Sequence, residues 1–135
     1  MLCRGSTSVV LLLLKGTIDN QIEFEKETRI FKLNHPNVVK ALGTYRVRDK
    51  NFYLVTEYCK WGTLTSYLSR FGREMTIHKQ LDFSLQIALA CKYLEEYRIV
   101  QREISTRTCQ VAEAGRDTII KVTGVLYSVL TFIDR

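Results

Sequence analysis

The chain is poor in the features that mark several classes of protein. Its longest apolar run covers residues 9–14, whereas a membrane span needs about 20 apolar residues and a secretory signal roughly 7–15. A single proline and seven glycines leave no room for a low-complexity linker. The net charge of +6 is spread along the chain without a basic stripe interleaved with aromatic residues, so nucleic-acid binding is not predicted. These absences favour one soluble globular domain without a membrane span.

Cysteine is present but shows no pattern. Cys3, Cys59, Cys91 and Cys109 are widely separated and lack the short spacings of metal ligands. Isolated cysteines of this kind are usually reduced thiols in a cytosolic protein. We therefore expect a cytoplasmic protein without a cysteine-bound metal.

The hydrophobic pattern predicts helices and strands in a particular order. The predicted elements are a strand at 9–14, a helix at 22–33, strands at 38–45 and 51–56, helices at 62–68 and 77–97, and short strands within 100–111 and at 118–122. Asn20 and Thr76 are the expected caps of the helices at 22–33 and 77–97. Strands with one helix among them, followed by helices, predict an α+β fold.

The predicted helix at 77–97 is apolar over a broad part of its circumference. Two adjacent lines of apolar residues run along it: Phe83, Ile87, Ala90 and Leu94 form one, and Leu81, Leu85 and Ala88 form the other. So broad an apolar stripe is typical of a helix that packs deep in a core.

The segment Phe52–Leu68 is the most informative part of the chain. Its pattern predicts a buried strand with a polar C-terminal end, followed by Gly62 and a short helix. In layout it resembles the hinge between the two lobes of a protein kinase, and its side chains resemble those of tyrosine kinases. This resemblance puts Thr56 at the gatekeeper position of the nucleotide cleft.

Other segments resemble parts of the same family in the same order. These are 9–15 for the strand with the phosphate-contacting lysine, 24–39 for the αC helix and its turn, 86–95 for the helix before the catalytic loop, 101–108 for that loop, and 121–126 for the metal-binding strand end. Arg107 favours the tyrosine-kinase branch. Several matches in order indicate the fold and say little about activity.

The resemblance implies a single, incomplete kinase-like domain over residues 1–135. Residues of about 1–60 would form the mostly antiparallel N-lobe and the hinge, and about 61–135 a partial, mainly helical C-lobe. About half of the family's domain would be absent. We therefore expect Phe83, Ile87 and Leu94 to be partly uncovered, a condition that usually signals a partner or aggregation.

The catalytic positions implied by the resemblance carry altered residues. Glu103 stands where the family has the aspartate that orients the substrate hydroxyl, and its extra methylene displaces the carboxylate by roughly 1 Å, enough to cost on the order of a hundredfold in rate. Thr108 and Gly124 replace the asparagine and aspartate that hold magnesium. Magnesium needs several hard oxygen ligands in near-octahedral positions. No metal site is therefore expected, and phosphoryl transfer is not predicted.

Some residues of the implied nucleotide site are retained. Lys15 would contact phosphate and Glu27 would hold Lys15, although Glu27 is also interpretable as one more solvated acid on a charged helix. Thr56 would line the cleft, and the backbone of Glu57 and Cys59 would pair with adenine. Glu27 precedes His35 by one position fewer than is usual in the family.

Other residues oppose nucleotide binding. Leu13 stands where kinases keep a small alanine over the adenine ring, and Gln110 stands where an apolar side chain forms the floor. The segment 5–9 has one glycine in place of a glycine-rich phosphate loop. We therefore expect no cofactor, with ATP binding left open as the alternative.

These observations lead to one functional hypothesis and two alternatives. The hypothesis is a catalytically inactive kinase-like module that acts in signalling by binding a protein partner, such as another kinase. The first alternative is a residual ATP-dependent tyrosine kinase that uses Lys15 and Glu103. The second is a kinase fragment without a function of its own.

Overall fold

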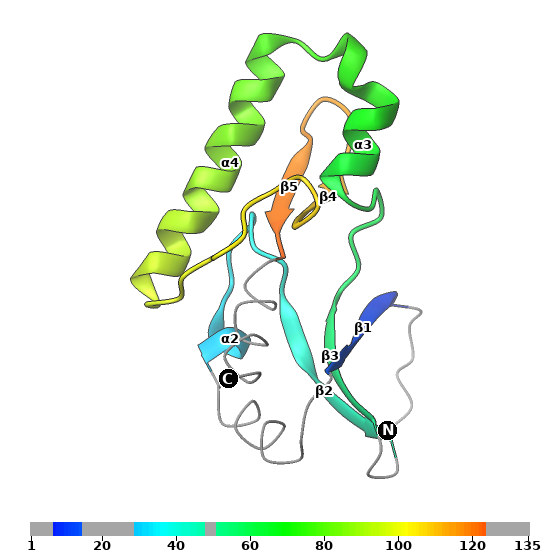
Figure 1. Cartoon of the computed structure of the whole chain (residues 1–135), viewed down its shortest axis with the longest axis vertical. Coiled ribbons are helices and arrows are strands. Elements are labelled where there is room, and N and C mark those ends of the chain that lie inside the picture. The colour runs from blue at the N-terminus through cyan, green and yellow to red at the C-terminus, as the bar shows by residue number, and fades with distance from the viewer. Residues whose placement is uncertain (1–6, 15–28, 48–50, 124–135) are drawn as a thin grey trace.

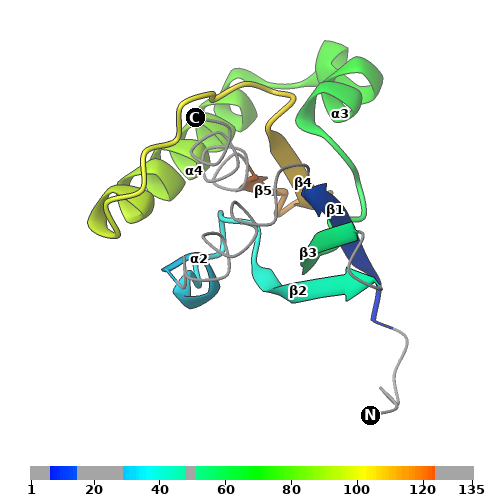
Figure 2. The same cartoon turned by 60° about the horizontal axis from the view of Figure 1, so that its bottom comes forward.

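The computed structural model describes residues 7–14, 29–47 and 51–123. Figure 1 shows a three-stranded sheet and a short helix in one half of the molecule, and two longer helices with a two-stranded sheet in the other. The same division is visible in Figure 2, where the strands of the first sheet lie next to one another away from α4. The predicted α+β fold is confirmed.

The first sheet has the antiparallel order β1-β3-β2, formed by β1 (Val9–Leu14), β3 (Asn51–Glu57) and β2 (Ala41–Val47). In the central strand β3, Phe52, Leu54 and Thr56 alternate with less buried residues and face the core. This alternation follows from the period of two in a strand. The predicted strands at 9–14 and 51–56 are confirmed.

Strand β2 begins three residues later than the predicted start at residue 38. Val38 and Val39 pair with the end of the second sheet, because the Val39 amide donates to the Val122 carbonyl at 3.1 Å. The Val122 amide in turn donates to the Asn37 carbonyl at 2.8 Å. These bonds tie the two sheets to each other through backbone alone.

Helix α2 (Arg29–Lys32) is the described end of the helix predicted at 22–33. Ile30 is buried in the core beside Leu33, whose amide donates to the Ile30 carbonyl. The beginning of the predicted helix, with its cap and Glu27, lies outside the described residues. The chain then passes Asn37 into β2.

Helix α3 (Leu64–Phe71) begins at Thr63, whose hydroxyl accepts a hydrogen bond from the Ser66 amide at 3.2 Å. The helix extends one turn beyond the predicted end at Leu68, and a 3₁₀ turn, η1 (Gly72–Glu74), follows it. The Tyr67 ring packs against Phe71, which adds apolar contact to the final turn. This contact between residues four positions apart within the helix favours the extra length.

Helix α4 (Ile77–Glu96) is capped by Thr76, as predicted, because its hydroxyl accepts a bond from the Lys79 amide at 3.3 Å. The helix ends where Arg98 adopts a positive φ of 56°. The Ile99 amide closes this end by donating to the Leu94 carbonyl at 3.0 Å. The chain can then reverse direction along the helix, as Figure 1 shows.

The two apolar lines of α4 have different environments, which corrects the expectation of a helix packed deep in a core. Phe83, Ala90 and Leu94 are buried, so the predicted exposure of Phe83 and Leu94 is wrong, whereas Ile87 is partly buried against the core. The second line faces outward, with Leu81 63% and Leu85 57% exposed. Among the described elements, α4 packs mainly on β5 of the second sheet, and only one line can reach this sheet.

That second sheet is a hairpin of β4 (Cys109–Glu113) and β5 (Ile119–Val122). Val111 and Ile120 point into the core that α3, α4 and the first sheet share. The predicted short strands near these positions are confirmed. No helix in the described parts of the chain has the length and apolar character that crossing a membrane requires.

Candidate functional site

A cavity of about 190 Å³ lies between the first sheet, the segment after β3 and the hairpin. Three residues predicted for a nucleotide site, Thr56, Glu57 and Cys59, are brought together in its wall. Lys15 and Glu27 lie outside the described residues. The remaining lining residues are Val10, Leu12, Val39, Tyr58, Lys60, Gly62, Gln110 and Thr123.

The cavity is small for a ligand site. Pockets for drug-sized ligands and cofactors typically enclose about 300–1,000 Å³. The observed volume of about 190 Å³ is below that range.

The roof of the cavity differs from the sequence prediction. Val10 and Leu12 line it, while Leu13 is 46% exposed and belongs to the other face of β1. The pairing of Val10 with Thr56 and of Leu12 with Leu54 produces this arrangement, because alternate residues of a strand face opposite sides. A leucine does occupy the roof, but it is Leu12 and not the predicted Leu13.

The floor includes Gln110, as predicted. This residue is fixed by a bridge to Thr63 at the start of α3. Backbone bonds hold the adjacent residue Val111: the Trp61 amide donates to the Val111 carbonyl at 3.1 Å, and the Val111 amide donates to the Gly62 carbonyl at 2.9 Å. Gly62 completes the turn with a φ of +72°, a conformation that favours glycine.

The carboxylate of Glu57 is already occupied. Its Oε1 atom accepts from Lys121 Nζ at 2.6 Å and from the Lys40 amide at 2.8 Å. Both side chains of the ion pair are largely sheltered from solvent. The sequence prediction concerned only the backbone of Glu57, and 64 positions separate the two partners, so no local pattern reveals the pair.

The backbone next to the cavity is partly committed to the fold. The Glu57 amide donates to the Lys40 carbonyl at 3.0 Å, and the Cys59 carbonyl accepts from the Gly62 amide at 3.2 Å. The Glu57 carbonyl accepts a long bond of 3.3 Å from the Thr56 hydroxyl.

The Cys59 thiol is buried beside this backbone. Burial, with the nearby Glu57 carboxylate as a smaller cause, raises the pKa of Cys59 from 9.0 to about 11. The thiol is therefore protonated at neutral pH. Since the thiolate is the nucleophilic form, Cys59 is a small apolar wall residue and not a reactive group.

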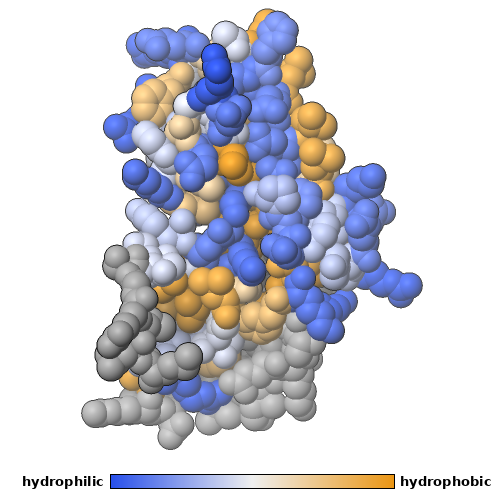
Figure 3. Space-filling model, turned by 180° about the vertical axis from the view of Figure 1, so that it is seen from behind, coloured by the Kyte–Doolittle hydropathy of each residue, from blue (hydrophilic) through white to orange (hydrophobic). Residues whose placement is uncertain are grey.

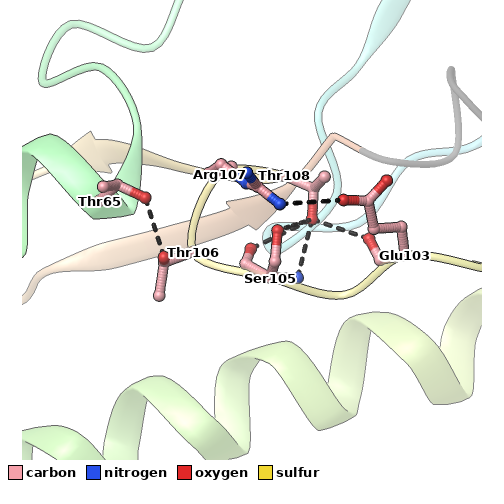
Figure 4. A network of polar contacts seen from close by, with 6 residues as sticks. All are labelled: Thr65, Glu103, Ser105, Thr106, Arg107 and Thr108. Carbon is pink, nitrogen blue, oxygen red and sulfur yellow. Dashed lines mark hydrogen bonds and ion pairs between the residues drawn. The ribbon is translucent and has the colours of Figure 1, made fainter.

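The loop before β4 contains Glu103, the candidate catalytic acid. Its carboxylate points toward Arg107, with 3.6 Å between Oε1 and Nη2, and these side chains are 64% and 78% exposed (Figure 4). An ion pair this exposed contributes at most about 1 kcal/mol. The carboxylate is thus accessible to a substrate and only weakly held.

Thr108 is buried and uses its hydroxyl inside the loop. The Oγ1 atom lies 2.8 Å from the Glu103 carbonyl and 3.1 Å from the Ser105 carbonyl, and it accepts from the Ser105 amide at 3.0 Å. Figure 4 shows these contacts converging on one oxygen. A hydroxyl has one proton and two lone pairs. Thr108 Oγ1 therefore stabilises the loop and is poorly placed to bind a cation.

Further contacts fix the loop on both sides. The Thr65 and Thr106 hydroxyls are 2.8 Å apart, and the Thr65 amide donates to the Thr106 carbonyl, which joins the loop to α3. On the other side, Thr123 donates to the Thr108 carbonyl from its amide at 2.8 Å and from its hydroxyl at 2.7 Å. The end of β5 thus lies against Thr108, while Gly124 lies outside the described residues.

Residues 4–126 match the family described as protein tyrosine and serine/threonine kinase. The chain belongs to this kinase family. It is 30% identical over 127 residues to tyrosine-protein kinase SRK3 of Spongilla lacustris, with 87% of the chain and 38% of that protein covered. It is 35% identical over 119 residues to tyrosine-protein kinase ABL2 of Homo sapiens, with 87% and 10% covered. The chain thus spans less than two fifths of the length of these relatives.

Within this kinase chain, the geometry brings the implied catalytic loop and strand end together. Thr108 and Thr123 are in contact, so the two segments that would carry metal ligands are adjacent. In the described residues, no group of three or more His, Cys, Asp or Glu side chains is arranged to hold a metal ion. The roles of Glu103, Lys15 and Glu27 stay predictions.

Proposed function

We propose that this kinase-family chain is a catalytically inactive module that works by binding protein partners. The observation that carries the proposal is the state of Thr108. Its hydroxyl is committed to Glu103 and Ser105 within the loop. Phosphoryl transfer depends on positioning and on cations that neutralise the developing charge, and a neutral, occupied hydroxyl supplies neither.

The cleft supports the same proposal. Its volume of about 190 Å³ is small for a nucleotide, and Leu12 occupies the roof. The Glu57 carboxylate is bound by Lys121, which links the segment after β3 to the hairpin and makes this wall part of the fold. A wall held by such a contact favours a structural use of the cleft.

The outer face of α4 supports a binding role. Leu81, Leu85 and Leu89 are all exposed on this helix. Seen from behind, the half of the molecule that contains α4 carries a column of apolar side chains along its edge (Figure 3). Contiguous apolar surface of several hundred Å² typically marks an interaction site. A signalling protein, such as another kinase, is the kind of partner that we propose.

One observation favours the second candidate, a residual tyrosine kinase. Glu103 presents an exposed carboxylate next to Arg107, and the relatives named above are tyrosine-protein kinases. An orienting carboxylate alone supplies only part of the rate enhancement of general acid–base catalysis, about 10²–10⁴-fold. We therefore rank this candidate below the inactive module.

The cellular location that we propose is the cytoplasm. Cys59, Cys91 and Cys109 are free thiols, and free buried thiols are usual in reducing compartments.

A phosphotransfer assay tests the proposal. The full chain is incubated with ATP labelled at the γ-phosphate, magnesium and a tyrosine-containing peptide, and no label is expected in the peptide. The Glu103→Gln variant is the matched control. Label that appears with the original chain and disappears with Glu103→Gln would overturn the proposal, whereas label that persists in both identifies a contaminating kinase.

A thermal-shift titration with ATP, with and without magnesium, separates the remaining alternatives. We expect a cooperative melt with no magnesium-dependent rise in melting temperature. A rise that is lost in Lys15→Ala would support the residual kinase. A melt without cooperativity would favour a fragment that has no function of its own.

A further inference from the structure

The exposed residues on the outer face of α4 are regularly spaced, and they include charged residues as well as leucines. Six exposed residues follow one another at alternating intervals of four and three positions: His78, Asp82, Leu85, Leu89, Lys92 and Glu96. We call this set the α4 seam. An average interval of 3.5 residues keeps side chains on one side of a helix and is the pattern by which two helices pack side by side.

The seam also has an ordered arrangement of charge. Leucines occupy its middle, with Leu85 57% and Leu89 43% exposed. His78 and Asp82 precede the leucines, and Lys92 and Glu96 follow them. At each end, a basic residue therefore comes before an acidic one. When the seam is aligned with its own reversed order, each basic residue therefore falls opposite an acidic one, and the two leucines fall opposite each other.

We propose that a second copy of this chain packs antiparallel against the α4 seam. In that arrangement Leu85 meets Leu89 of the other copy, and Asp82 meets Lys92. His78 meets Glu96 in the outermost layer. A two-fold axis between Leu85 and Leu89 repeats every contact, as a closed symmetric dimer requires.

The charges select the antiparallel direction. A parallel pair would place Asp82 against Asp82, Lys92 against Lys92 and Glu96 against Glu96. Like charges facing each other across an interface are strongly unfavourable, whereas opposite charges fix the register. The Asp82 carboxylate accepts a bond from Gln86 Nε2 at 2.8 Å through Oδ2, which leaves Oδ1 for a lysine of the second copy.

A hollow beside the seam fits the same arrangement. It measures about 500 Å³ and lies at the end of α4, with Cys91, Ile99 and Val100 in its wall. At 100° per residue, Leu81 and Cys91 lie on the same flank of the seam. An antiparallel second copy therefore places its own exposed Leu81 on the side of α4 on which this hollow lies.

This proposal goes beyond the binding role above because it names the partner, and it does not depend on the loss of catalysis. A chain that is monomeric and also fails to transfer phosphate would overturn the dimer and leave the inactive module standing. A dimer that transfers phosphate would overturn the inactive module and leave the dimer standing. The two outcomes are thus distinguishable.

Sedimentation equilibrium of the full chain over a range of micromolar concentrations is the first test. We expect a monomer–dimer equilibrium, weakened roughly 100-fold by Leu85→Glu, because that change places two carboxylates in the apolar centre of the interface. A chain that is monomeric at every concentration would overturn the proposal, even if another protein binds the same face.

Charge reversal tests the direction. Asp82→Lys and Lys92→Asp should each weaken the dimer roughly tenfold, and the double variant should restore it, because the opposite charges meet again. Asp117→Lys makes the same chemical change at an exposed position outside the seam and should have no effect. Single variants without effect, or a double variant that stays weak, would overturn the antiparallel pairing.

Circular dichroism checks that each variant keeps its helix content. The two single charge reversals probe one contact from opposite sides. If one of them unfolds, the other still decides the outcome, and loss of the dimer in that folded variant supports the pairing.

Discussion

Two polar clusters in this molecule have opposite construction. The first joins Asn37, Gln86 and Ile120, which lie far apart in the sequence, by buried or partly buried hydrogen bonds of 2.8–2.9 Å. The second joins Glu103, Ser105 and Thr108, which lie within one loop. The first cluster connects α4, β5 and the segment before β2, whereas the bonds of the Thr108 hydroxyl in the second cluster stay within the loop.

The difference indicates which features of a kinase this chain retains. The contacts of the first cluster are long-range and paired, as most buried polar groups are. At the position implied to bind magnesium, a side chain has instead turned inward to stabilise its own loop. Four experiments would break or sharpen this contrast.

The largest effect is expected from truncation of the inner face of α4. Leu94 is fully buried in the core, so Leu94→Ala should reduce the free energy of unfolding by about 3 kcal/mol. Leu81→Ala on the outer face should cost less than about 0.5 kcal/mol in dilute protein. Urea denaturation of both variants measures the difference, and equal costs would contradict the assignment of the two faces.

Removal of the Gln86 amide should have the next largest effect. Gln86→Leu leaves the buried Ile120 amide without its acceptor and removes one of the two acceptors of Asn37 Nδ2, which should cost about 2 kcal/mol of stability. Ser84→Ala, on the exposed side of the same helix, is the control and should cost less than about 0.5 kcal/mol. A change in Gln86→Leu no larger than in the control would show that the first cluster is not stabilising.

The loop cluster should contribute less. Thr108→Val keeps the shape of the side chain but removes the hydroxyl, and a loss of about 1–2 kcal/mol is expected. Thr106→Val removes a hydroxyl whose bond to Thr65 is exposed and should cost about 0.5 kcal/mol. If chemical denaturation shows a larger loss of stability for Thr106→Val than for Thr108→Val, Thr108 is not the residue that stabilises the loop.

The last prediction concerns pH. Burial raises the pKa of Cys59 and of Cys109 from 9.0 to about 11. The folded state therefore retains protons that the unfolded state releases, so this contribution to stability is present below pH 9 and is lost as the pH rises toward about 11. The urea midpoint should fall between pH 8 and pH 10, and less so in a variant with both cysteines changed to alanine. Equal pH dependence in both proteins would contradict the proposed cause.

Much of the fold was predictable because its signals are local. The Thr76 cap and the strand at 9–14 depend on short-range stereochemistry, and the structure confirms them. The buried side of α4 was not predictable, since both of its lines are apolar and only the position of the second sheet distinguishes Leu94 from Leu85.

The candidate site was less predictable. The contact of Glu57 with Lys121 and the inward turn of Thr108 depend on tertiary placement. The choice of Leu12 over Leu13 for the roof depends on strand register, and a shift of one residue exchanges the two faces. Sequence identifies residue types at a site, whereas their partners come from the fold.

The bonds of Asn37 and Val39 to the end of β5 also bear on how the protein is made. Asn37 Nδ2 donates to the Ile120 carbonyl, 83 positions later in the chain. Synthesis proceeds from the N-terminus at about 5–20 residues per second, so this early segment waits several seconds for its partner to leave the ribosome. During that interval the buried valines before β2 have nothing to cover them, and a chaperone that shields nascent chains would find its binding site there.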